Sequence, residues 1–254
     1  MQKCKGCGKC IEICPVKCIV PSKKYGLVTD HKHCVGCMKC VDACFYGARE
    51  MKGEDIESKE LLELILKDKG FYDNSDGGVT FSGGEVFIQS EFFSEILKSC
   101  RVKGIHTAVE TSLQAKWEDI EKALPYIDLI FCDYKHWDSK MHKQFTGSGN
   151  ELIWSNLKKI AALDKEIIVR IPCIPGFNND VLTIRCMLEK LENIGIKKVE
   201  LLPFHRIGSD KYKGLGRTYK YGEQKSIKRS ELLVYESLAE DLKLTLKIGG
   251  RKER

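Results

Sequence analysis

Eight cysteines near the start of the chain follow one spacing, written twice. In each run two, two and three residues separate successive cysteines, and the second run starts 30 residues after the first. The runs are Cys4, Cys7, Cys10 and Cys14, and then Cys34, Cys37, Cys40 and Cys44. Two-residue gaps let three thiolates of one tight turn reach three irons of a cubic cluster. In a paired arrangement the fourth cysteine of each run ligates the cluster of the other run.

This spacing predicts two [4Fe–4S] clusters with crossed ligand sets. The first set is Cys4, Cys7, Cys10 and Cys44, and the second is Cys34, Cys37, Cys40 and Cys14. Zinc sites and disulfides also use paired cysteines, but two complete runs of four favour clusters over both. Cys18 stands where the second run has Ala48, and we expect a packed small residue there, not a ligand. Residues 1–52 are therefore expected to form a ferredoxin-like domain.

Composition and charge limit the remaining possibilities. The net charge is +6 over 254 residues, which is too mild to indicate a nucleic-acid partner. No apolar run approaches the roughly 18 residues of a membrane span, and the N-terminus lacks the apolar stretch of a signal peptide. Thirteen cysteines arranged for iron ligation indicate a reducing, anaerobic cytoplasm. Residues 1–52 hold 10 Lys and Arg against 4 acidic residues, a surplus that would offset anionic clusters and raise their reduction potentials.

Residues 53–254 alternate between helical and strand patterns. Apolar strand runs lie at 79–81, 107–109, 129–132, 167–171, 199–202 and 244–248, with amphipathic segments between them. Asn150 is expected to cap one helix, and residues 208–229 read as a Gly-, Lys- and Tyr-rich loop. Strand–helix repetition predicts an α/β fold with a parallel sheet. The continuous apolar runs indicate strands that are buried on both faces.

Charged residues follow most of these strands, at the end where parallel sheets place their sites. We expect six of them to converge on one rim, although each could instead lie alone on the surface. Gly83-Gly84-Glu85 would suit an ammonium group, Lys135 a carboxylate, and His205 can donate a hydrogen bond, so an amino-acid zwitterion would fit. A phosphate loop is disfavoured because no GxGxxG or GxxxxGK[ST] motif is present. The six are Glu85, Glu110, Asp133, Lys135, Arg170 and His205.

Several motifs, in order along nearly the whole chain, resemble those of glycyl radical enzyme activating enzymes, a radical S-adenosylmethionine family similar to the pyruvate formate-lyase activating enzyme. A subgroup of that family carries a two-cluster ferredoxin insert. The matching stretches are 77–86 (GGVTFSGGEV), 106–112 (HTAVETS), 133–136 (DYKH), 146–147 (TG), 170–176 (RIPCIPG), 201–206 (LLPFHR), 211–212 (KY) and 215–216 (LG).

The resemblance implies a partial (β/α)6 radical SAM-type barrel and a specific reaction. A third [4Fe–4S] cluster would chelate S-adenosylmethionine, whose reductive cleavage generates a radical on a glycine of a partner enzyme. Two ferredoxin-type clusters would relay electrons from a flavodoxin or ferredoxin-type donor. Gly83, Gly84 and Glu85 would bind the methionine amino group. Asp133, Tyr134, Lys135, Arg170 and His205 would contact or lie near S-adenosylmethionine, and Glu110, Thr111 and Asp133 would hold a monovalent cation.

One expected motif is absent from this sequence. The family holds its third cluster with Cys-x3-Cys-x2-Cys, and none of the thirteen cysteines stands in that pattern, so no catalytic cluster ligand is identified. We therefore expect a chain that lacks the first barrel strand, is a truncated form of a longer protein, and does not cleave S-adenosylmethionine as written. The alternatives are a non-enzymatic iron–sulfur electron-transfer protein and a non-functional remnant. A smaller departure is Val86, where the family has proline.

Overall fold

The computed structural model describes residues 3–249, which form two compact units. The first unit comprises residues up to 55 together with 205–225, and the second comprises 56–204 and the residues from 226 onward. The N-terminal boundary lies close to the expected one after residue 52. The addition of 205–225 was not expected, because this segment lies between two strands of the sheet in the sequence.

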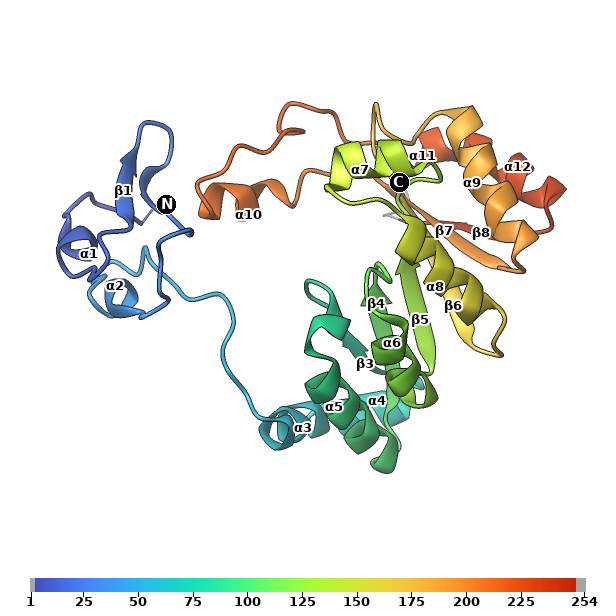
Figure 1. The fold of residues 1–254 in the computed structure, drawn as a ribbon, viewed down its shortest axis with the longest axis horizontal. Helices are drawn as coiled ribbons and strands as arrows, with labels where there is room; N and C mark the ends of the chain where they lie inside the picture. Colours follow the sequence, from blue (N-terminus) through green and yellow to red (C-terminus); the bar gives the residue numbers. More distant parts are fainter. Residues whose placement is uncertain (1–2, 250–254) are drawn as a thin grey trace. The chain divides into compact units, whose positions relative to one another are not determined.

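Short elements build the first unit (Figure 1). They are α1 (Lys9–Glu12), β1 (Ile19–Ser22), β2 (Gly26–Thr29), α2 (Lys39–Asp42) and α10 (Ser209–Gly214). Strands β1 and β2 pair antiparallel from Ile19 opposite Thr29 to Ser22 opposite Gly26, and Gly26 has a φ of 72° at the turn. In the sequence, the segments 19–21 and 27–29 with Gly26 between them predict a small hairpin that joins the two cysteine runs. The structure confirms this prediction.

Segment 205–225 packs against the hairpin of the first unit. The Tyr25 hydroxyl donates to the carbonyl of Arg217 at 3.2 Å. Gly216 has a φ of +66°, and a Cβ atom added there would lie 2.7 Å from Cγ1 of Val28. A side chain at position 216 would therefore clash with the hairpin, so glycine permits this close approach. The loop expected at 208–229 thus contains helix α10 and belongs largely to the cysteine-bearing unit.

The second unit is built on a six-stranded parallel sheet, with the strands in sequence order β3-β4-β5-β6-β7-β8. Within residues 3–249, strand β3 pairs with β4 alone, so it forms one edge of the sheet. The strands are β3 (Gly78–Phe81), β4 (His106–Thr111), β5 (Leu129–Asp133), β6 (Glu166–Cys173), β7 (Lys198–Pro203) and β8 (Thr245–Ile248).

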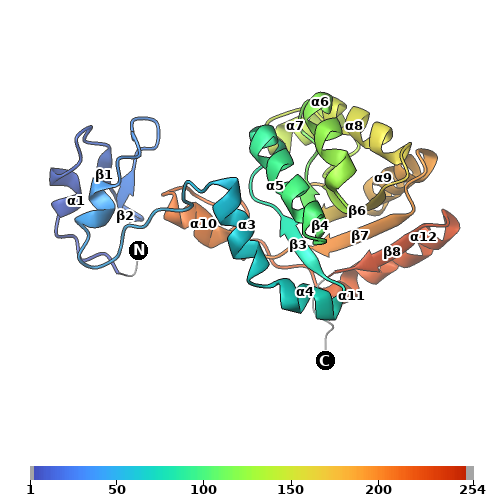
Figure 2. The same ribbon diagram turned by 90° about the horizontal axis from the view of Figure 1, so that it is seen from below.

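Helices connect successive strands, and α5, α6, α8 and α9 cover one face of the curved sheet (Figure 2). Asn150 stands at the N-cap of α8 without a capping side-chain bond; its amide nitrogen donates to the carbonyls of His136 and Trp137 instead. No helix in residues 3–249 is long and apolar enough to cross a membrane. The helices are α3 (Ser58–Leu66), α4 (Lys69–Ser75), η1 (Val86–Gln89), α5 (Ser90–Val102), α6 (Trp117–Ala123), η2 (Leu124–Tyr126), α7 (Ser139–Thr146), α8 (Glu151–Ala161), α9 (Val181–Asn193), α11 (Arg229–Leu232), η3 (Leu233–Tyr235) and α12 (Glu236–Asp241).

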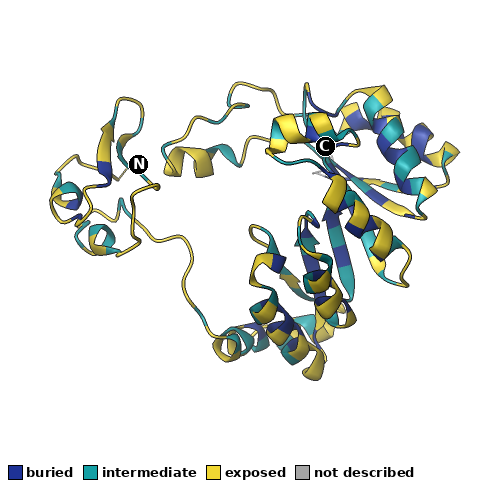
Figure 3. Ribbon diagram, in the orientation of Figure 1, coloured by how far each residue is buried: buried dark blue, intermediate teal, exposed yellow. Residues whose placement is uncertain are grey.

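Burial alternates along the central strands (Figure 3). Ile130, Val169, Ile171 and Leu201 are at most 2% exposed and belong to the core formed with the helices. The residues between them on these strands are only partly buried, and several are charged. The expectation of strands buried on both faces is therefore wrong for this sheet. Its second face is half-exposed and carries the side chains of the candidate site.

Candidate functional site

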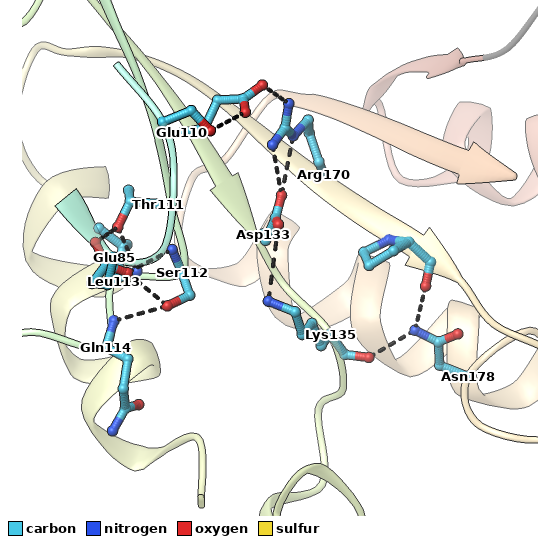
Figure 4. Close-up of polar contacts among 12 residues, drawn as sticks. Glu85, Glu110, Thr111, Ser112, Leu113, Gln114, Asp133, Lys135, Arg170 and Asn178 are labelled. Atoms are coloured by element: carbon cyan, nitrogen blue, oxygen red, sulfur yellow. Dashed lines mark hydrogen bonds and ion pairs between the residues drawn. The ribbon is translucent and has the colours of Figure 1, made fainter. Parts of the chain in front are cut away.

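A guanidinium joins two carboxylates on the half-exposed face of the sheet (Figure 4). Arg170 of β6 donates from Nη1 to Glu110 of β4 at 2.6 Å, and from Nη2 and Nε to Asp133 of β5 at 2.9 and 3.1 Å. Asp133 and Arg170 are register partners on neighbouring strands. To reach Glu110, the Arg170 side chain passes over the ring of Phe131, with its Cζ 5.1 Å from the ring centroid.

Partial burial of these three side chains strengthens the electrostatic interactions between them. The Arg170 side chain is 15% exposed, against 33% for Glu110 and 31% for Asp133. The Ser82 hydroxyl donates to the second oxygen of Glu110 at 2.7 Å, and this bond, together with Arg170, lowers the pKa of the Glu110 carboxyl. Burial works to lower the pKa of Arg170, but its two carboxylate partners outweigh burial and raise it. Glu110 and Arg170 are therefore both charged at neutral pH.

Glu85 lies beside this network and is held by the end of β4. Its carboxylate accepts from the Thr111 hydroxyl at 2.6 Å, the Ser112 hydroxyl at 2.7 Å and the Ser112 amide at 3.0 Å. Gly83 precedes it with a φ of +137°, which L side chains rarely adopt. Gly84 has no atom within 4 Å of where a Cβ would stand, so both glycines offer open backbone next to a fixed carboxylate.

Lys135 follows β5 and points back toward Asp133, with Nζ 3.9 Å from the second carboxylate oxygen (Figure 4). Asn178, which is fully buried, fixes the backbone behind it. The Asn178 amide nitrogen donates to the carbonyls of Lys135 and Pro172, at 2.7 and 2.9 Å, and its oxygen accepts from the Ile174 amide at 2.7 Å. One amide side chain therefore clamps the loops after β5 and β6 together.

Two expected site residues are not part of this network as the second unit presents it. Tyr134 is 2% exposed, and its ring stacks on Trp154 of α8, because successive residues after β5 alternate between the faces of the sheet. Tyr134 therefore does not join Asp133 and Lys135. His205 belongs to the first unit, so its place beside these side chains stays a prediction.

The sequence did not single out Asn178 or a second buried amide, Asn156. The Asn156 amide nitrogen donates to the carbonyls of Leu113 and Ala115, at 3.0 and 2.8 Å, and so holds the loop that follows Thr111 and Ser112. Asn156 is 1% exposed. A polar residue inside the apolar pattern of α8 was the available signal, because buried amides are retained where they satisfy backbone groups.

In the first unit, one cavity is lined by all four cysteines of the first expected set. Its lining also includes three cations, Lys5, Lys9 and Arg49. Cysteines on the wall of one cavity, with glycines at the turns and cations around them, fit an anionic four-thiolate cluster. The four cysteines are Cys4, Cys7, Cys10 and Cys44.

Two cysteines of the second expected set, Cys14 and Cys34, lie next to Cys18. The Cys18 sulfur lies 3.5 Å from that of Cys14, and contact with Cys14 and Cys34 contributes, after burial, to raising the pKa of the Cys18 thiol to about 12. Cys18 is 5% exposed, in agreement with a packed residue. Within residues 3–249, no three His, Cys, Asp or Glu side chains are gathered closely enough to hold a single metal ion.

Two family models match this chain. The radical SAM superfamily model matches residues 31–185, and a 4Fe-4S dicluster domain model matches residues 3–48. These families imply iron–sulfur clusters and S-adenosylmethionine as cofactors.

Proteins of known activity align along most of the chain. The (2S)-3-sulfopropanediol dehydratase activating enzyme of Klebsiella oxytoca is 40% identical over 240 residues, which cover 93% of this chain and 76% of the relative. The trans-4-hydroxy-L-proline dehydratase activating enzyme of Clostridioides difficile is 38% identical over 252 residues, covering 98% and 83%. The choline trimethylamine-lyase activating enzyme of Oleidesulfovibrio alaskensis is 39% identical over 222 residues, covering 85% and 72%.

Two solved structures are similar to this chain. A domain of the pyruvate-formate lyase-activating enzyme from Bacteroides vulgatus is similar at a TM-score of 0.58 and 32% identity, covering 68% of this chain and 99% of that one. Streptococcus suis SuiB, bound to precursor peptide SuiA, shares the fold at a TM-score of 0.60 and 15% identity, covering 80% of this chain and 44% of SuiB. From its family matches, its relatives and its fold, the chain belongs to the radical SAM superfamily and, within it, to the glycyl radical enzyme activating enzymes.

Proposed function

We propose that this chain serves the activation of a glycyl radical enzyme, with S-adenosylmethionine bound at the half-exposed sheet face and electrons relayed through the first unit. The observation that carries the proposal is the charged network of Glu110, Asp133 and Arg170 beside Glu85 and Lys135. It gathers residues of four expected site motifs from different strand ends, on the face that the helices leave open.

The side chains offer complementary charges for an amino-acid zwitterion. Glu85 and the open backbone of Gly83 and Gly84 would receive the ammonium group, and Lys135 would receive the carboxylate. Arg170 would hold Asp133 and Glu110 in place through its hydrogen bonds to both carboxylates. Tyr134 would act from the opposite face by packing on Trp154, and His205 would contact the ligand from the first unit.

A monovalent cation at Glu110, Thr111 and Asp133 stays a prediction. Both carboxylates already bond to Arg170, and the Thr111 hydroxyl donates to Glu85. A cation would therefore share its ligands with the guanidinium. A cation dependence would show as tighter S-adenosylmethionine binding in potassium or sodium than in a large organic cation at equal ionic strength.

The first unit would hold two [4Fe–4S] clusters, with ligand sets Cys4, Cys7, Cys10, Cys44 and Cys34, Cys37, Cys40, Cys14. When bound, such clusters supply single electrons. The surrounding residues would hold the thiolates and cover them, segment 205–225 included. The packing of this segment on the hairpin supports a role within the unit.

The third cluster of the family needs Cys-x3-Cys-x2-Cys, which this sequence does not contain. We therefore propose cleavage of S-adenosylmethionine only for a form of the protein that carries this motif. The partner would be a glycyl radical enzyme, as the names of the relatives indicate for those proteins. A flavodoxin or ferredoxin-type protein would be the electron donor.

Calorimetric titration of S-adenosylmethionine into the reconstituted chain tests the binding step. We expect Asp133→Asn and Lys135→Met to weaken binding at least tenfold, whereas Lys198→Met, which removes an exposed ion pair with Glu166, should leave it unchanged. Equal binding by all four proteins would contradict the assigned site. With the three-cysteine motif restored, dithionite reduction should release 5′-deoxyadenosine.

The second candidate is an electron-transfer protein without this chemistry. The complete ferredoxin-type cysteine runs and the missing three-cysteine motif favour it. It predicts a full complement of about eight irons with no measurable S-adenosylmethionine binding, so the same titration separates the two functions.

A further inference from the structure

Solvent exposure and hydrogen bonds to sulfur are two of the factors that set a cluster's reduction potential. The two cysteine sets of the first unit are matched in exposure and share one bond to sulfur each, and the second set has a further weak bond from the Gly36 amide to Cys34 Sγ at 3.5 Å. Each set has two exposed cysteines, one intermediate and one buried. Each fourth cysteine accepts a backbone N–H four residues on: Cys18 to Cys14 at 3.4 Å, and Ala48 to Cys44 at 3.2 Å. A difference between the clusters must therefore come mainly from the side chains around them.

Those side chains differ in charge. At the 30-residue offset of the repeat, Lys5 corresponds to Val35 and Arg49 corresponds to Ile19. Lys5 and Arg49 both line the cavity of the first set. Val35 is exposed and uncharged, and Ile19 is 3% exposed within the core of the unit.

The other charges near the runs largely cancel in this comparison. Lys9 corresponds to Lys39, and Glu12 to Asp42, so each loop has one cation and one carboxylate at these places. Glu50 follows Arg49 in the sequence, but its carboxylate is paired with Lys52 at 2.6 Å. Lys17, which follows Cys14, corresponds to the uncharged Gly47, and its ammonium donates to the Glu12 carbonyl at 3.0 Å. The first set therefore has Lys5 and Arg49 where the second has Lys17, a surplus of one positive charge.

Arg49 is held in place, unlike an ordinary surface arginine. Its Nη1 donates to the Thr29 hydroxyl at 2.6 Å, and its Nη2 donates to the carbonyl of Leu27 at 3.0 Å. These bonds fix the guanidinium to the hairpin, where it lines the cavity together with Cys44. A fixed charge in a partly buried position is screened less than a mobile lysine.

We propose that Lys5 and Arg49 give the cluster held by Cys4, Cys7, Cys10 and Cys44 the higher reduction potential, so that the first electron entering the unit rests there. Reduction adds a negative charge to a cluster, and nearby cations stabilise that charge. The inference rests on the proposed binding of two clusters. It orders the two stations of the proposed electron relay.

Two features reduce the expected difference in reduction potential between the two clusters. The Cys18 thiol contacts Cys14 at 3.5 Å, and a donated S–H would raise the potential of the second cluster, but S–H is a weak donor compared with a full charge. Arg49 also reaches Cys40, where its charge opposes the effect of burial, which raises the pKa of that thiol. Arg49 therefore acts on both clusters, whereas Lys5, on the wall of the first cavity, is the selective residue.

A redox titration of the full reconstituted chain, followed by electron paramagnetic resonance, tests the order directly. The wild type should reduce in two one-electron steps. Arg49→Gln should lower the reduction potential of the upper step. The expected change is about tenfold in the equilibrium between oxidised and reduced cluster, which is about 59 mV for a one-electron couple. The lower step should also move, because Arg49 reaches Cys40 of the second set.

The repeat itself provides matched variants. Lys5→Val gives the first loop the residue of the second and should lower only the upper potential. Val35→Lys makes the reverse exchange and should raise only the lower potential. A Lys5→Val variant that lowers the lower step, or three variants that move neither step, would overturn the inference. The iron content of the reconstituted chain distinguishes a failure of this inference from a failure of the proposed function. About eight irons per chain with unchanged potentials would reject only the proposed order of the two clusters. About four irons, or none, would reject the two-cluster relay itself.

Discussion

The two units of the protein have cores of different kinds. In the second unit, Ile96, Leu157, Ile171 and Leu201 are completely buried among helices and strands. In the first unit the buried core consists of four residues, and three of them are cysteines: Cys10, Cys14 and Cys18, with Ile19. The first unit therefore owes its apolar interior largely to thiols, two of which are proposed ligands. The sheet unit therefore positions its functional residues by packing, whereas the cysteine loops of the first unit depend on the clusters that they are proposed to bind.

Removal of the clusters should have the largest effect and should separate the two units. Chelation under oxidising conditions is expected to unfold residues 3–55, because small units without a sufficient apolar core need metal or another constraint to fold. Strands β4–β7 should stay folded. Hydrogen exchange resolved by peptide measures both regions in one sample. Unchanged protection of residues 3–55 in the iron-free chain would show that their core suffices alone.

The sheet unit can be challenged at its charged network. Arg170→Met should lower the free energy of unfolding by about 3 kcal/mol, because two half-buried carboxylates lose their partner. Arg101→Met is a suitable control, since the Arg101 side chain is 58% exposed and its pair with Asp128 is expected to contribute less than about 1 kcal/mol. Urea denaturation followed by circular dichroism measures both, and equal losses would mean that the network carries no special stability.

Asn178 tests whether packing alone positions the rim. Asn178→Ala leaves two carbonyls and one amide without their partner in a fully buried place, and should cost about 2 kcal/mol. It should also weaken S-adenosylmethionine binding, because the loops after β5 and β6 lose their clamp. Asn74→Ala, which removes an exposed bond to the Gly70 carbonyl, should change stability by less than about 0.5 kcal/mol. Unchanged ligand affinity in Asn178→Ala would limit its role to stability.

In the first unit, a backbone contact can be broken without touching a cysteine. Gly216→Ala should destabilise this unit by about 1 to 2 kcal/mol, because φ is +66° and the new Cβ would lie 2.7 Å from Val28. Gly214→Ala is the matched control, since no atom lies within 4 Å and the residue is helical. Faster exchange of residues 19–29 in the first variant alone would locate the effect in the hairpin.

The sequence predicted those features that depend on local spacing. The cysteine runs, the hairpin between them and the charged residues after β4, β5 and β6 all follow from motifs or strand patterns. The gathering of Glu110, Asp133 and Arg170 could also be expected, because neighbouring parallel strands end at the same edge. Strand alternation could have placed Tyr134 on the opposite face, although its motif suggested otherwise.

The features that the sequence did not reveal depend on contacts between distant segments. Asn178 and Asn156 act on backbone groups of other loops, and nothing in their own surroundings states which groups these are. Segment 205–225 lies between β7 and β8 in the sequence but packs with Tyr25 and Val28. The second face of the sheet is half-exposed because no described helix of its unit covers it as the helices cover the first face. The apolar patterns of the strands do not indicate which face is covered.

The smallest expected effect is a pH dependence of the sheet unit. The pKa of Glu110 is lowered in the folded chain by Ser82 and Arg170, so its ionised form stabilises the fold above the unfolded pKa of about 4.3. This contribution is lost as pH falls from there through the lower, folded pKa. The difference in unfolding free energy between wild type and Glu110→Gln should therefore be constant above about pH 5 and shrink below about pH 4. Urea titrations of both proteins across this range measure it. If the difference in unfolding free energy instead grows as the pH falls, the ionised Glu110 carboxylate opposes folding. In that case only the ion pair of Arg170 with Asp133 would stabilise the fold.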